Sequence, residues 1–541
     1  MLGVKLRGYM MSESHALRSD HSYDVVIIGS GAGGATIAQS LAATGKSVLI
    51  LERGEHLPQE EDNWNPRAVF IDRKYASGER WKDRDGKTIK PAIHYWVGGN
   101  TSFYGAALFR FRKRDFEETK HYDGVSPAWP ISYDDLAPYY TRAEKAWKVH
   151  GSRKNPESLD PTDDLDAPEY AYPPIEHDPE VLTLKNRLRK SGWNAFDLPL
   201  GIDRDDTQPW KGKCIRCDTC GGFPCRVLGK SDARQVIHSL SDNQNITLAS
   251  GMLVTRLETS PDGKTITQVV CESSEGEHRF KGDIVVLAAG AINSAALLLK
   301  SANGAHENGL ANGSDQVGRN YMFHTSSAVV SLTRHRVNAV FPKTFAINDF
   351  YWNDPEGGFD YPMGHIQLLE HMNGDVIQGQ AQERIPEWLV PNFMADAIAS
   401  RLLAFLVMSE DLPEQRNRVR LDKNGEIVID YWANNLVGHE RLVKKFEKKL
   451  SKLGRLRKCY RDHRFQIDEL LPLYGTAHQC GTVRMGNDPK SSVVNAQCKA
   501  HEVDNLYIAD SGVFVTSAAV NPALTVVANA MRVGEHIVGQ L

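Results

Sequence analysis

The chain has 541 residues, a formal net charge of −4 and 41% hydrophobic residues. This length exceeds what one compact core usually holds, so we expect at least two domains. The small charge, without a long basic run, argues against a nucleic-acid partner, and no stretch approaches the roughly 18 apolar residues of a membrane span.

The N-terminal segment, residues 1–21, is polar and lacks the apolar core and cleavage site of a secretory signal. We expect this segment to be disordered. The whole chain contains eight cysteines, which do not make a disulfide scaffold at this length. A reducing, cytoplasmic location is therefore expected.

A glycine motif follows the first apolar run of the chain. Tyr23–Ile28 is typical of a buried parallel strand, and Gly29, Gly31 and Gly34 follow it as G-x-G-x-x-G. These glycines permit a tight turn, a close approach of the backbone to a pyrophosphate and close packing of the next helix on the strand. The alternative is an α/β unit whose glycines serve packing alone.

The next predicted strand, Val48–Leu51, ends at an acidic residue, Glu52. A carboxylate about 20 residues beyond the glycines can accept hydrogen bonds from both hydroxyls of an adenosine ribose. It would also repel a 2′-phosphate, so NADP is disfavoured. Strand, helix, second strand and terminal acid together predict a dinucleotide-binding unit.

A long segment without periodicity, Arg53–His94, comes next and is typical of a lid or an extended cofactor cover. The following Gly98, Gly99, Asn100 and Thr101 would let backbone and short polar groups approach a flat ligand closely. A simple turn is the alternative. Further along, a helix is predicted at residues 133–149, and residues 152–174, rich in Pro and Asp, are interpreted as a surface excursion.

Four cysteines, Cys214, Cys217, Cys220 and Cys225, lie within twelve residues. This density suits an iron–sulfur cluster or zinc. However, the last gap is one residue longer than in the ferredoxin run, and Pro224 precedes the last cysteine instead of following it. An iron–sulfur cluster, a zinc site and free or locally paired thiols all stay open, and we assign no metal site.

The pattern then becomes rich in strands. Strands are predicted at residues 252–257, 265–272, 278–280 and 284–287, followed by a helix at 292–300. The run at 284–287 is wholly apolar and suits the parallel sheet begun at residue 23. The next part of the chain suggests a second, largely antiparallel domain. Its predicted elements are strands at 328–332, 344–350, 363–369 and 403–409, a hairpin of 418–421 with 427–431, and a helix at 439–453. The fold class is therefore α/β: a Rossmann-type domain with a mixed sheet and a β-meander, plus an antiparallel-sheet domain.

The last part of the chain again contains candidate functional residues. His478 lies in a small, polar, glycine-spaced stretch, and a strand at 506–509 ends in Asp510. Asn521 is a good N-cap and Pro522 a good first residue for a helix that ends near residue 538. The free N–H groups and positive partial charge of such a helix end would suit the pyrimidine edge of a flavin.

Six segments, taken in order, resemble the glucose–methanol–choline (GMC) oxidoreductase family of FAD enzymes. They are GSGAGG with Glu52, VGGNT, VVLAAGAINS at 285–294, VGRNYMFH at 317–324, HQCGTVRMG at 478–486 and NLYIADSGVF…NPALT at 505–525. Within the family, the chain is most similar to the bacterial sugar and aminoglycoside-type dehydrogenases and the pyranose-oxidase branch.

The resemblance implies an FAD-binding domain (22–150, 212–325 and 472–541) and a substrate-binding domain (151–211 and 326–471). It places Glu52 at the adenosine ribose, Val254 near adenine, Asn100 and Thr101 near the isoalloxazine, and Asp510 near the ribitol or pyrophosphate. The expected cofactor-binding residues are Gly29, Ser30, Gly31, Gly34, Glu52, Arg53, Gly98, Gly99, Asn100, Thr101, Val254, Ala289, Asp510 and Pro522.

The resemblance also assigns the catalytic pair. His478 matches the active-site histidine, and Asn521 matches the second position, which is His or Asn across the family. His478 would then be the general base, because a neutral imidazole titrates near working pH, and Asn521 would stabilise the developing alkoxide. A structural histidine and a helix cap are the alternatives. Some members attach FAD through a histidine at the position of Phe103, so we expect non-covalent FAD here.

The predicted function is oxidation of a CH–OH group of an alcohol, sugar or glycoside, with O2 or another electron acceptor. Three alternatives stay open: an electron-transfer subunit with a cysteine-bound cluster, a lyase on the same scaffold, and an NAD-dependent Rossmann enzyme. The NAD alternative leaves the segment from Asp510 to Thr525 unexplained. No motif in the sequence identifies the substrate or the oligomeric state.

Overall fold

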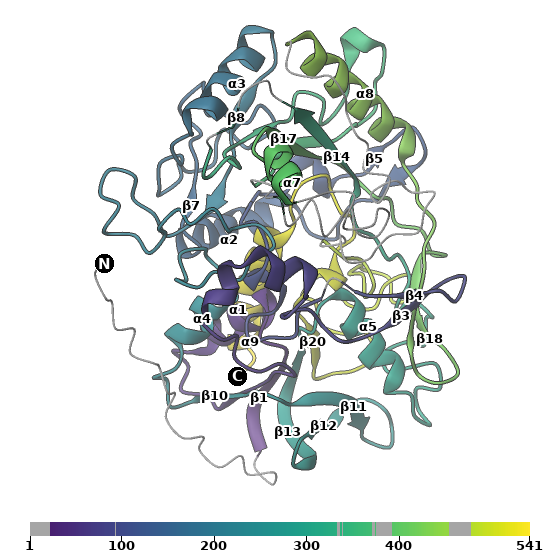
Figure 1. The fold of residues 1–541 in the computed structure, drawn as a ribbon. Helices are drawn as coiled ribbons and strands as arrows, with labels where there is room; N and C mark the ends of the chain where they lie inside the picture. The colour runs from purple at the N-terminus through teal and green to yellow at the C-terminus, as the bar shows by residue number, and fades with distance from the viewer. Residues whose placement is uncertain are drawn as a thin grey trace.

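The computed structural model describes residues 22–91, 93–332, 336–337, 339–370, 374, 392–453 and 478–541. The segment expected to be disordered, residues 1–21, lies outside the described residues, as does part of the region between the last predicted strands and His478. Figure 1 shows the strands of one sheet in the lower part of the view, with α3 and α8 at the upper end.

The larger sheet has seven strands and mixes parallel and antiparallel pairing. Five strands are parallel neighbours: β10 (Ile246–Ala249), β2 (Val48–Leu51), β1 (Ser22–Ile28), β13 (Gly276–Leu287) and β20 (Leu506–Ile508). The other end of β13 continues antiparallel through β12 (Ile266–Ser273) to β11 (Leu253–Thr259). This confirms the predicted Rossmann-type sheet with a meander.

One strand prediction is wrong in detail. The segments at 278–280 and 284–287 were expected as separate strands, but they form the single long strand β13. The residues between them stay extended because β13 pairs there with β1, whose Tyr23 lies opposite Gly282. One strand therefore belongs to both the meander and the parallel sheet.

Helices cover this sheet with small and apolar faces. α1 (Ala32–Leu41) packs against α9 (Ala523–Val538) and α4 (Ala233–Ser239), and α9 also packs against α2 (Tyr133–Ala146). α5 (Ala291–Lys300) lies on β11. Figure 1 shows α1 and α9 side by side although they come from opposite ends of the chain.

A second sheet of five antiparallel strands has its own hydrophobic core. Its order is β14 (Thr325–Leu332), β17 (Leu402–Ser409), β16 (His365–Leu368), β15 (Phe345–Ile347) and β8 (Ala195–Asp197). α8 (Leu436–Lys452) packs on β14 and β17, and α3 (Pro179–Lys190) packs on β8. The sheet takes strands from both ranges assigned to the substrate domain, although the domain boundaries stay a prediction.

The predicted hairpin belongs to a third, smaller sheet. β18 (Arg418–Leu421) and β19 (Ile427–Asp430) pair with each other, and β19 pairs with β3 (Trp81–Asp83), which pairs with β4 (Thr88–Ile89). The cover segment at 53–94 is therefore tied to the later part of the chain. The remaining elements are short: β5 (Thr119–Lys120), β6 (Val125–Ser126), β7 (Val149–His150), β9 (Leu200–Gly201) and α7 (Asn392–Ala399).

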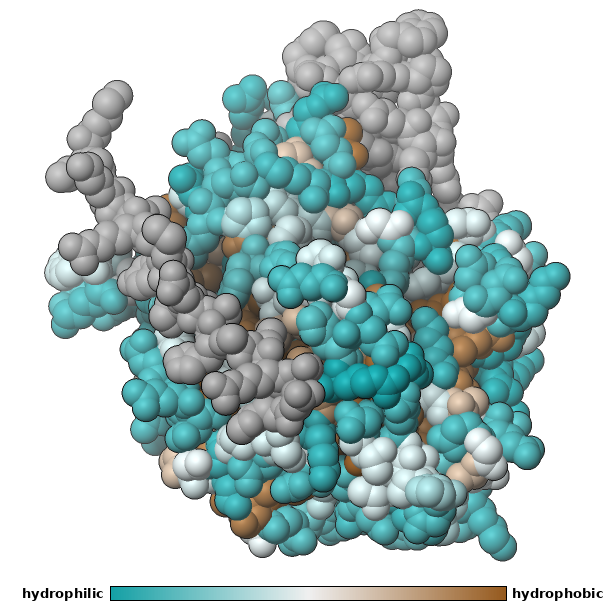
Figure 2. Space-filling model, turned by 90° about the horizontal axis from the view of Figure 1, so that it is seen from below, coloured by the Kyte–Doolittle hydropathy of each residue, from teal (hydrophilic) through white to brown (hydrophobic). Residues whose placement is uncertain are grey.

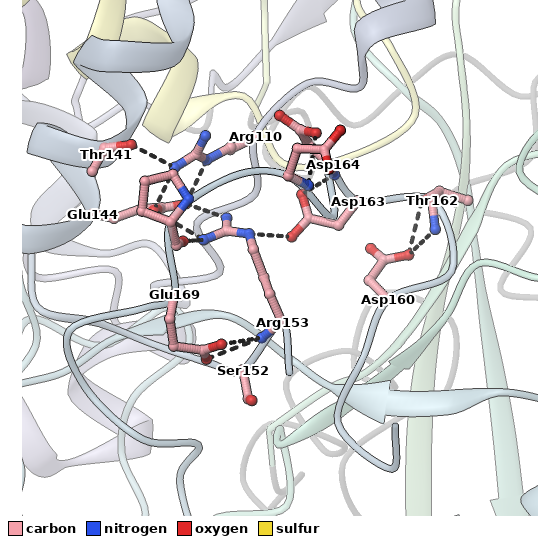
Figure 3. A network of polar contacts seen from close by, with 12 residues as sticks. Arg110, Thr141, Glu144, Ser152, Arg153, Asp160, Thr162, Asp163, Asp164 and Glu169 are labelled. Carbon is pink, nitrogen blue, oxygen red and sulfur yellow. Dashed lines mark hydrogen bonds and ion pairs between the residues drawn. The ribbon is translucent and has the colours of Figure 1, made fainter. Parts of the chain in front are cut away.

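The expected surface excursion at 152–174 is partly buried. Arg153 and Arg110 both bind the carboxylate of Glu144, and their side chains are at most 4% exposed. Asp163 takes a further bond from Arg153 at 2.9 Å. Figure 3 shows the two guanidinium groups converging on Glu144. Within this otherwise half-exposed segment, Arg153 and Asp163 therefore belong to a buried polar network.

The outer surface is mainly polar. On the face drawn in Figure 2, hydrophilic side chains cover most of the described surface, and hydrophobic residues show in small patches between them. Within the described ranges, no helix is both long enough and apolar enough to cross a bilayer.

Candidate active site

A cavity of about 800 Å³ opens where the parallel strands end. Ile28 at the end of β1, Glu52 after β2, Ala288 after β13 and Asp510 after β20 all line it. The crevice at the carboxyl ends of parallel strands is where ligands bind in open α/β sheets. Strand direction therefore brings residues from four distant segments to one site.

The N-terminus of α1 opens into this cavity and fits an anion. Its N-cap is Gly31, no side chain caps it, and no acidic residue lies in its first turn. A Cβ at Gly31 would meet no atom within 4 Å, whereas one at Gly34 would lie 1.9 Å from the carbonyl oxygen of Gly29. Gly29 has φ 101°, which only glycine adopts without strain. Free N–H groups and open space suit a pyrophosphate.

Glu52 is 6% exposed and is held by three donors. Its carboxylate accepts from the backbone N–H of Ser30 at 2.9 Å, the Ser30 hydroxyl at 2.6 Å and the N–H of Gly54 at 2.9 Å. Burial raises the pKa of Glu52 against the effect of these bonds. A carboxylate has about four acceptor positions, so one remains for a ribose.

Ser30 and Gly98 do not line the cavity, and the N–H of Gly98 donates to Ser30 Oγ at 3.0 Å.

The cover segment borders the same cavity. Arg53 and Val254 line it, and the Arg53 guanidinium lies 3.5 Å from the centre of the Tyr95 ring and 2.8 Å from Glu79. Glu79 also accepts from the Tyr95 hydroxyl at 2.5 Å. These contacts hold this part of the segment against the wall of the cavity.

Gly99, Asn100 and Thr101 line the cavity beside the cover. Asn100 Oδ1 accepts from the backbone N–H of His94 at 2.9 Å, and Thr101 Oγ1 donates to the carbonyl of Gly98. The His94 ring stacks on Phe103, with ring centres 3.7 Å apart. Phe103 occupies the cavity wall with a side chain that offers no nucleophile.

Asp510 lines the cavity and is held by three donors. Its carboxylate accepts from the N–H of Gly290 at 3.0 Å, the Ser294 hydroxyl at 2.5 Å and the N–H of Gly512 at 2.7 Å. Burial raises the pKa of Asp510 despite these bonds. Ala289 and Pro522 line the wall nearby.

His478 and Asn521 meet in the wall of the cavity. Asn521 Nδ2 lies 3.3 Å from His478 Nε2. Burial first, and then the neighbouring His324 and Lys343, lower the pKa of His478 well below its usual value. His478 is therefore a neutral imidazole at physiological pH.

The expected N-cap role of Asn521 is wrong. The N-cap of α9 is Pro522, and no side chain caps the helix. The amide of Asn521 instead faces His478, and its Oδ1 is buried without a hydrogen-bond partner within the described residues. A buried orphan acceptor beside a cavity is costly unless a ligand satisfies it. The competition between cap and substrate therefore does not arise.

Several residues at this end of the cavity were not predicted. His324, Ser326, Lys343 and Gln367 line it, and Lys343 pairs with Glu370 at 2.7 Å. His324 closes the VGRNYMFH segment and could have been found from that position. No local sequence motif marks Ser326, Lys343 and Gln367, because only the pairing of the strands in the second sheet brings these residues to the cavity.

The described cysteines are all free thiols. Burial raises the pKa of Cys214 and Cys220, and Cys225 Sγ accepts from the N–H of Gly229 at 3.2 Å. In the described part of the chain, no group of three or more His, Cys, Asp or Glu is placed to hold a metal ion. This arrangement does not favour the iron–sulfur alternative.

Comparison with known families matches two segments, residues 198–326 and 413–530, to the GMC oxidoreductase family. Residues 27–59 match an NAD(P)-binding Rossmann-like domain.

Full-length relatives carry names of oxidases and dehydrogenases. A 6‴-hydroxyparomomycin C oxidase of Streptomyces lividus is 30% identical, over 97% of this chain and 92% of the relative. Paromamine 6′-oxidase of Streptomyces fradiae is 29% identical, over 96% and 92%. A 2-methyl-1,2-propanediol dehydrogenase of Mycolicibacterium austroafricanum is 26% identical, over 95% of each chain.

Solved structures share the fold at lower identity. Pyridoxine 4-oxidase from Mesorbium loti superposes with a TM-score of 0.64 at 18% identity, over 95% of this chain and 99% of its own. A formate oxidase variant from Aspergillus oryzae gives 0.65 at 18% identity, over 96% and 99%. At this identity the likeness shows the fold alone.

Proposed function

This chain belongs to the GMC oxidoreductase family, and from that premise we propose that His478 and Asn521 carry out its alcohol chemistry. The protein is an FAD-dependent oxidoreductase that acts on a CH–OH group of an alcohol or sugar. The observation that supports the residue assignment is the contact, in the wall of the cavity, of a neutral imidazole with an amide that caps no helix.

The residues around the cavity fit FAD. The open N-terminus of α1 would hold the pyrophosphate, Glu52 the adenosine ribose, Val254 the adenine and Asp510 the ribitol or pyrophosphate. The loop at 98–101 would lie against the isoalloxazine. When bound, FAD supplies the acceptor for the hydride that leaves the substrate carbon.

The remaining chemistry belongs to the chain. His478 takes the hydroxyl proton of the substrate at Nε2, which bears the lone pair of the neutral ring when the ring proton is on Nδ1. Asn521 donates a hydrogen bond from its amide to the oxygen as negative charge develops there. This contact is stronger in the transition state than in the ground state, so it lowers the barrier. The cavity wall around both residues keeps the forming alkoxide away from bulk water.

The substrate class is proposed as a sugar, glycoside or other polyol. At the His478 end, the cavity offers the hydroxyl of Ser326, the ammonium of Lys343 and the amide of Gln367. Such groups can donate to and accept from several hydroxyls at once. The names of the Streptomyces relatives, which concern aminoglycosides, agree with a polyhydroxylated substrate.

Anaerobic titration tests this function. We expect purified, yellow holoprotein to be bleached by at least one member of a panel of sugars, aminoglycosides and glycosides, and more slowly by 2-methyl-1,2-propanediol and simple alcohols. Bleaching reports transfer of the hydride to the flavin without reference to the later acceptor. A correctly folded, flavin-loaded protein that no alcohol or sugar bleaches would contradict the proposal.

FAD is proposed to be held without a covalent bond, because Phe103 stands where a linking histidine would be needed. We expect acid precipitation to release all of the yellow chromophore into the supernatant. The measurement is the flavin absorbance of the supernatant and of the washed pellet. Colour that stays with the denatured pellet would refute non-covalent binding.

A cytoplasmic location and the two-domain division remain part of the proposal. Free thiols at all seven described cysteines support a reducing compartment. The separate core of the five-stranded sheet supports a second domain built from residues 151–211 and 326–471.

A further inference from the structure

A second histidine lies directly behind His478. The Nδ1 atoms of His478 and His324 are 2.8 Å apart, and the ring planes meet at 70°. The other nitrogen of His324, Nε2, lies 3.1 Å from the carbonyl oxygen of Ser517. His324 is 2% exposed, so water does not compete for these contacts.

These contacts determine where each proton sits. A carbonyl oxygen only accepts hydrogen bonds, so Nε2 of His324 carries the proton. Burial lowers the pKa of His324 to about 4, so the ring is neutral and its Nδ1 bears a lone pair. His478 must therefore donate from Nδ1, which leaves its Nε2 unprotonated.

The other neighbour of His478 agrees with this assignment. Asn521 presents Nδ2 to Nε2 of His478 at 3.3 Å. An amide nitrogen is only a donor, so it requires a lone pair on Nε2. The two contacts of His478 thus demand the same tautomer from opposite sides of the ring.

Asp411 fixes the position of His324 in two ways, through the backbone of Phe323 and through Ser517. The N–H of Phe323 donates to Asp411 Oδ2 at 3.0 Å. The Ser517 hydroxyl accepts from the Asp411 N–H and donates to the Asp411 carbonyl, each at 3.0 Å. Asp411 therefore sets both the backbone that carries His324 and the carbonyl that orients its ring.

The backbone of His478 is also specifically held. Its φ of 78° lies in the left-handed region, which costs a non-glycine residue of the order of 1–3 kcal/mol. Such strain persists only where surrounding contacts over-determine a conformation, and the His324 contact is one of them.

We propose that His324 is a positioning residue for the oxidation, which holds His478 in the tautomer whose Nε2 lone pair can accept the hydroxyl proton. The inference rests on the proposed role of His478 as the base. In the opposite tautomer, Nε2 would carry a hydrogen and could accept neither the substrate proton nor a hydrogen bond from Asn521 Nδ2.

The test compares His324→Leu, which has no acceptor, with His324→Asn, whose Oδ1 occupies the place of the histidine Nδ1. We expect His324→Leu to lower the limiting rate of anaerobic flavin reduction by about 10- to 100-fold, less than the full loss of a general base. The apparent substrate dissociation constant and the FAD content should change little. His324→Asn should recover most of the rate, because it restores the acceptor.

A matched control is His439→Leu. His439 is also buried, but it contacts Ser327 and Ser409 and not the cavity. It should leave the limiting rate per bound flavin unchanged. If His324→Leu does not retain FAD, His324→Gln replaces it, because the longer side chain moves the acceptor away from His478 and should be as slow.

The outcomes separate this inference from the base assignment. A slow His478→Ala variant beside a normal His324→Leu variant would overturn the positioning role alone. Equal rates for His324→Asn and His324→Leu would overturn it too, because a purely structural role would not depend on the acceptor. A normal rate in His478→Ala would instead remove the base assignment.

Discussion

Replacing His478 with alanine is expected to slow flavin reduction by about 10²- to 10⁴-fold, the range that a general base contributes. The variant should keep its FAD, because the His478 ring bonds to His324 and Asn521 and not to Glu52 or Asp510. The measurement is the limiting rate of anaerobic bleaching in a stopped-flow instrument, per bound flavin.

The pH dependence gives this prediction a second readout. The base works in its deprotonated form, and the pKa of His478 lies well below its usual value. The wild-type rate should therefore stay level as the pH falls from 8 towards about 6.5, the ordinary histidine pKa, and fall only at lower pH. The alanine variant should instead gain rate as the pH rises, because it depends on substrate that has ionised in solution.

Two controls accompany the alanine variant. Added imidazole should restore part of its rate by entering the vacated space. His278→Ala, in the meander and bonded to Ser273, should behave as wild type. A bleaching rate in His478→Ala within a few-fold of wild type would contradict the assignment.

Replacing Glu144 with glutamine is expected to cost about 3–5 kcal/mol of the free energy of unfolding, the usual cost of breaking a buried ion pair. Glu144 binds Arg110 through both carboxylate oxygens at 2.7 Å and Arg153 at 2.6 Å. Burial opposes the charge on both arginines, but Glu144 helps to raise their pKa values above the ordinary range. Glutamine keeps the volume and removes the charge, leaving two buried guanidinium groups undercompensated.

Urea unfolding of the holoprotein at fixed FAD concentration provides the measurement. The matched control is Glu440→Gln, which breaks the 3.1 Å pair with Lys444 on α8, where the side chains are 52% and 64% exposed. That substitution should cost at most about 0.5 kcal/mol. A cost below about 1 kcal/mol for Glu144→Gln would show that the network in Figure 3 does not depend on this charge.

The sequence predicted the cofactor-binding unit well because its signals are local. Strand, glycine turn, helix, strand and acid follow one another within 23–52, and each step depends on neighbouring residues. The same holds for the strands of the second sheet and for α8, whose periodicity fixes the element type. Prediction was weaker for the loop at 152–174, because its polar composition did not show that Arg153, Ser158 and Asp160 within it are buried.

The proposed catalytic pair, His478 and Asn521, shows what local sequence patterns could not predict. Capping preference placed the Asn521 side chain on its own helix, whereas in the structure the side chain contacts His478. A helix end that begins with Pro522 has one N–H fewer to satisfy, so the cap is dispensable. Only the tertiary contact with His478 shows that the amide is not used as a cap.

By itself, the amino-acid sequence determined the Rossmann-type unit, the order of its motifs and the identity of the residues that could do the chemistry. The tertiary structure decided which of them meet: His324 and His478 are 154 positions apart, and Lys343 reaches the cavity only through the loop before β15. The reason is physical. Local motifs are set by backbone geometry over a few turns, whereas the tautomer of a histidine is set by whichever donor or acceptor the packing of distant segments brings to each ring nitrogen.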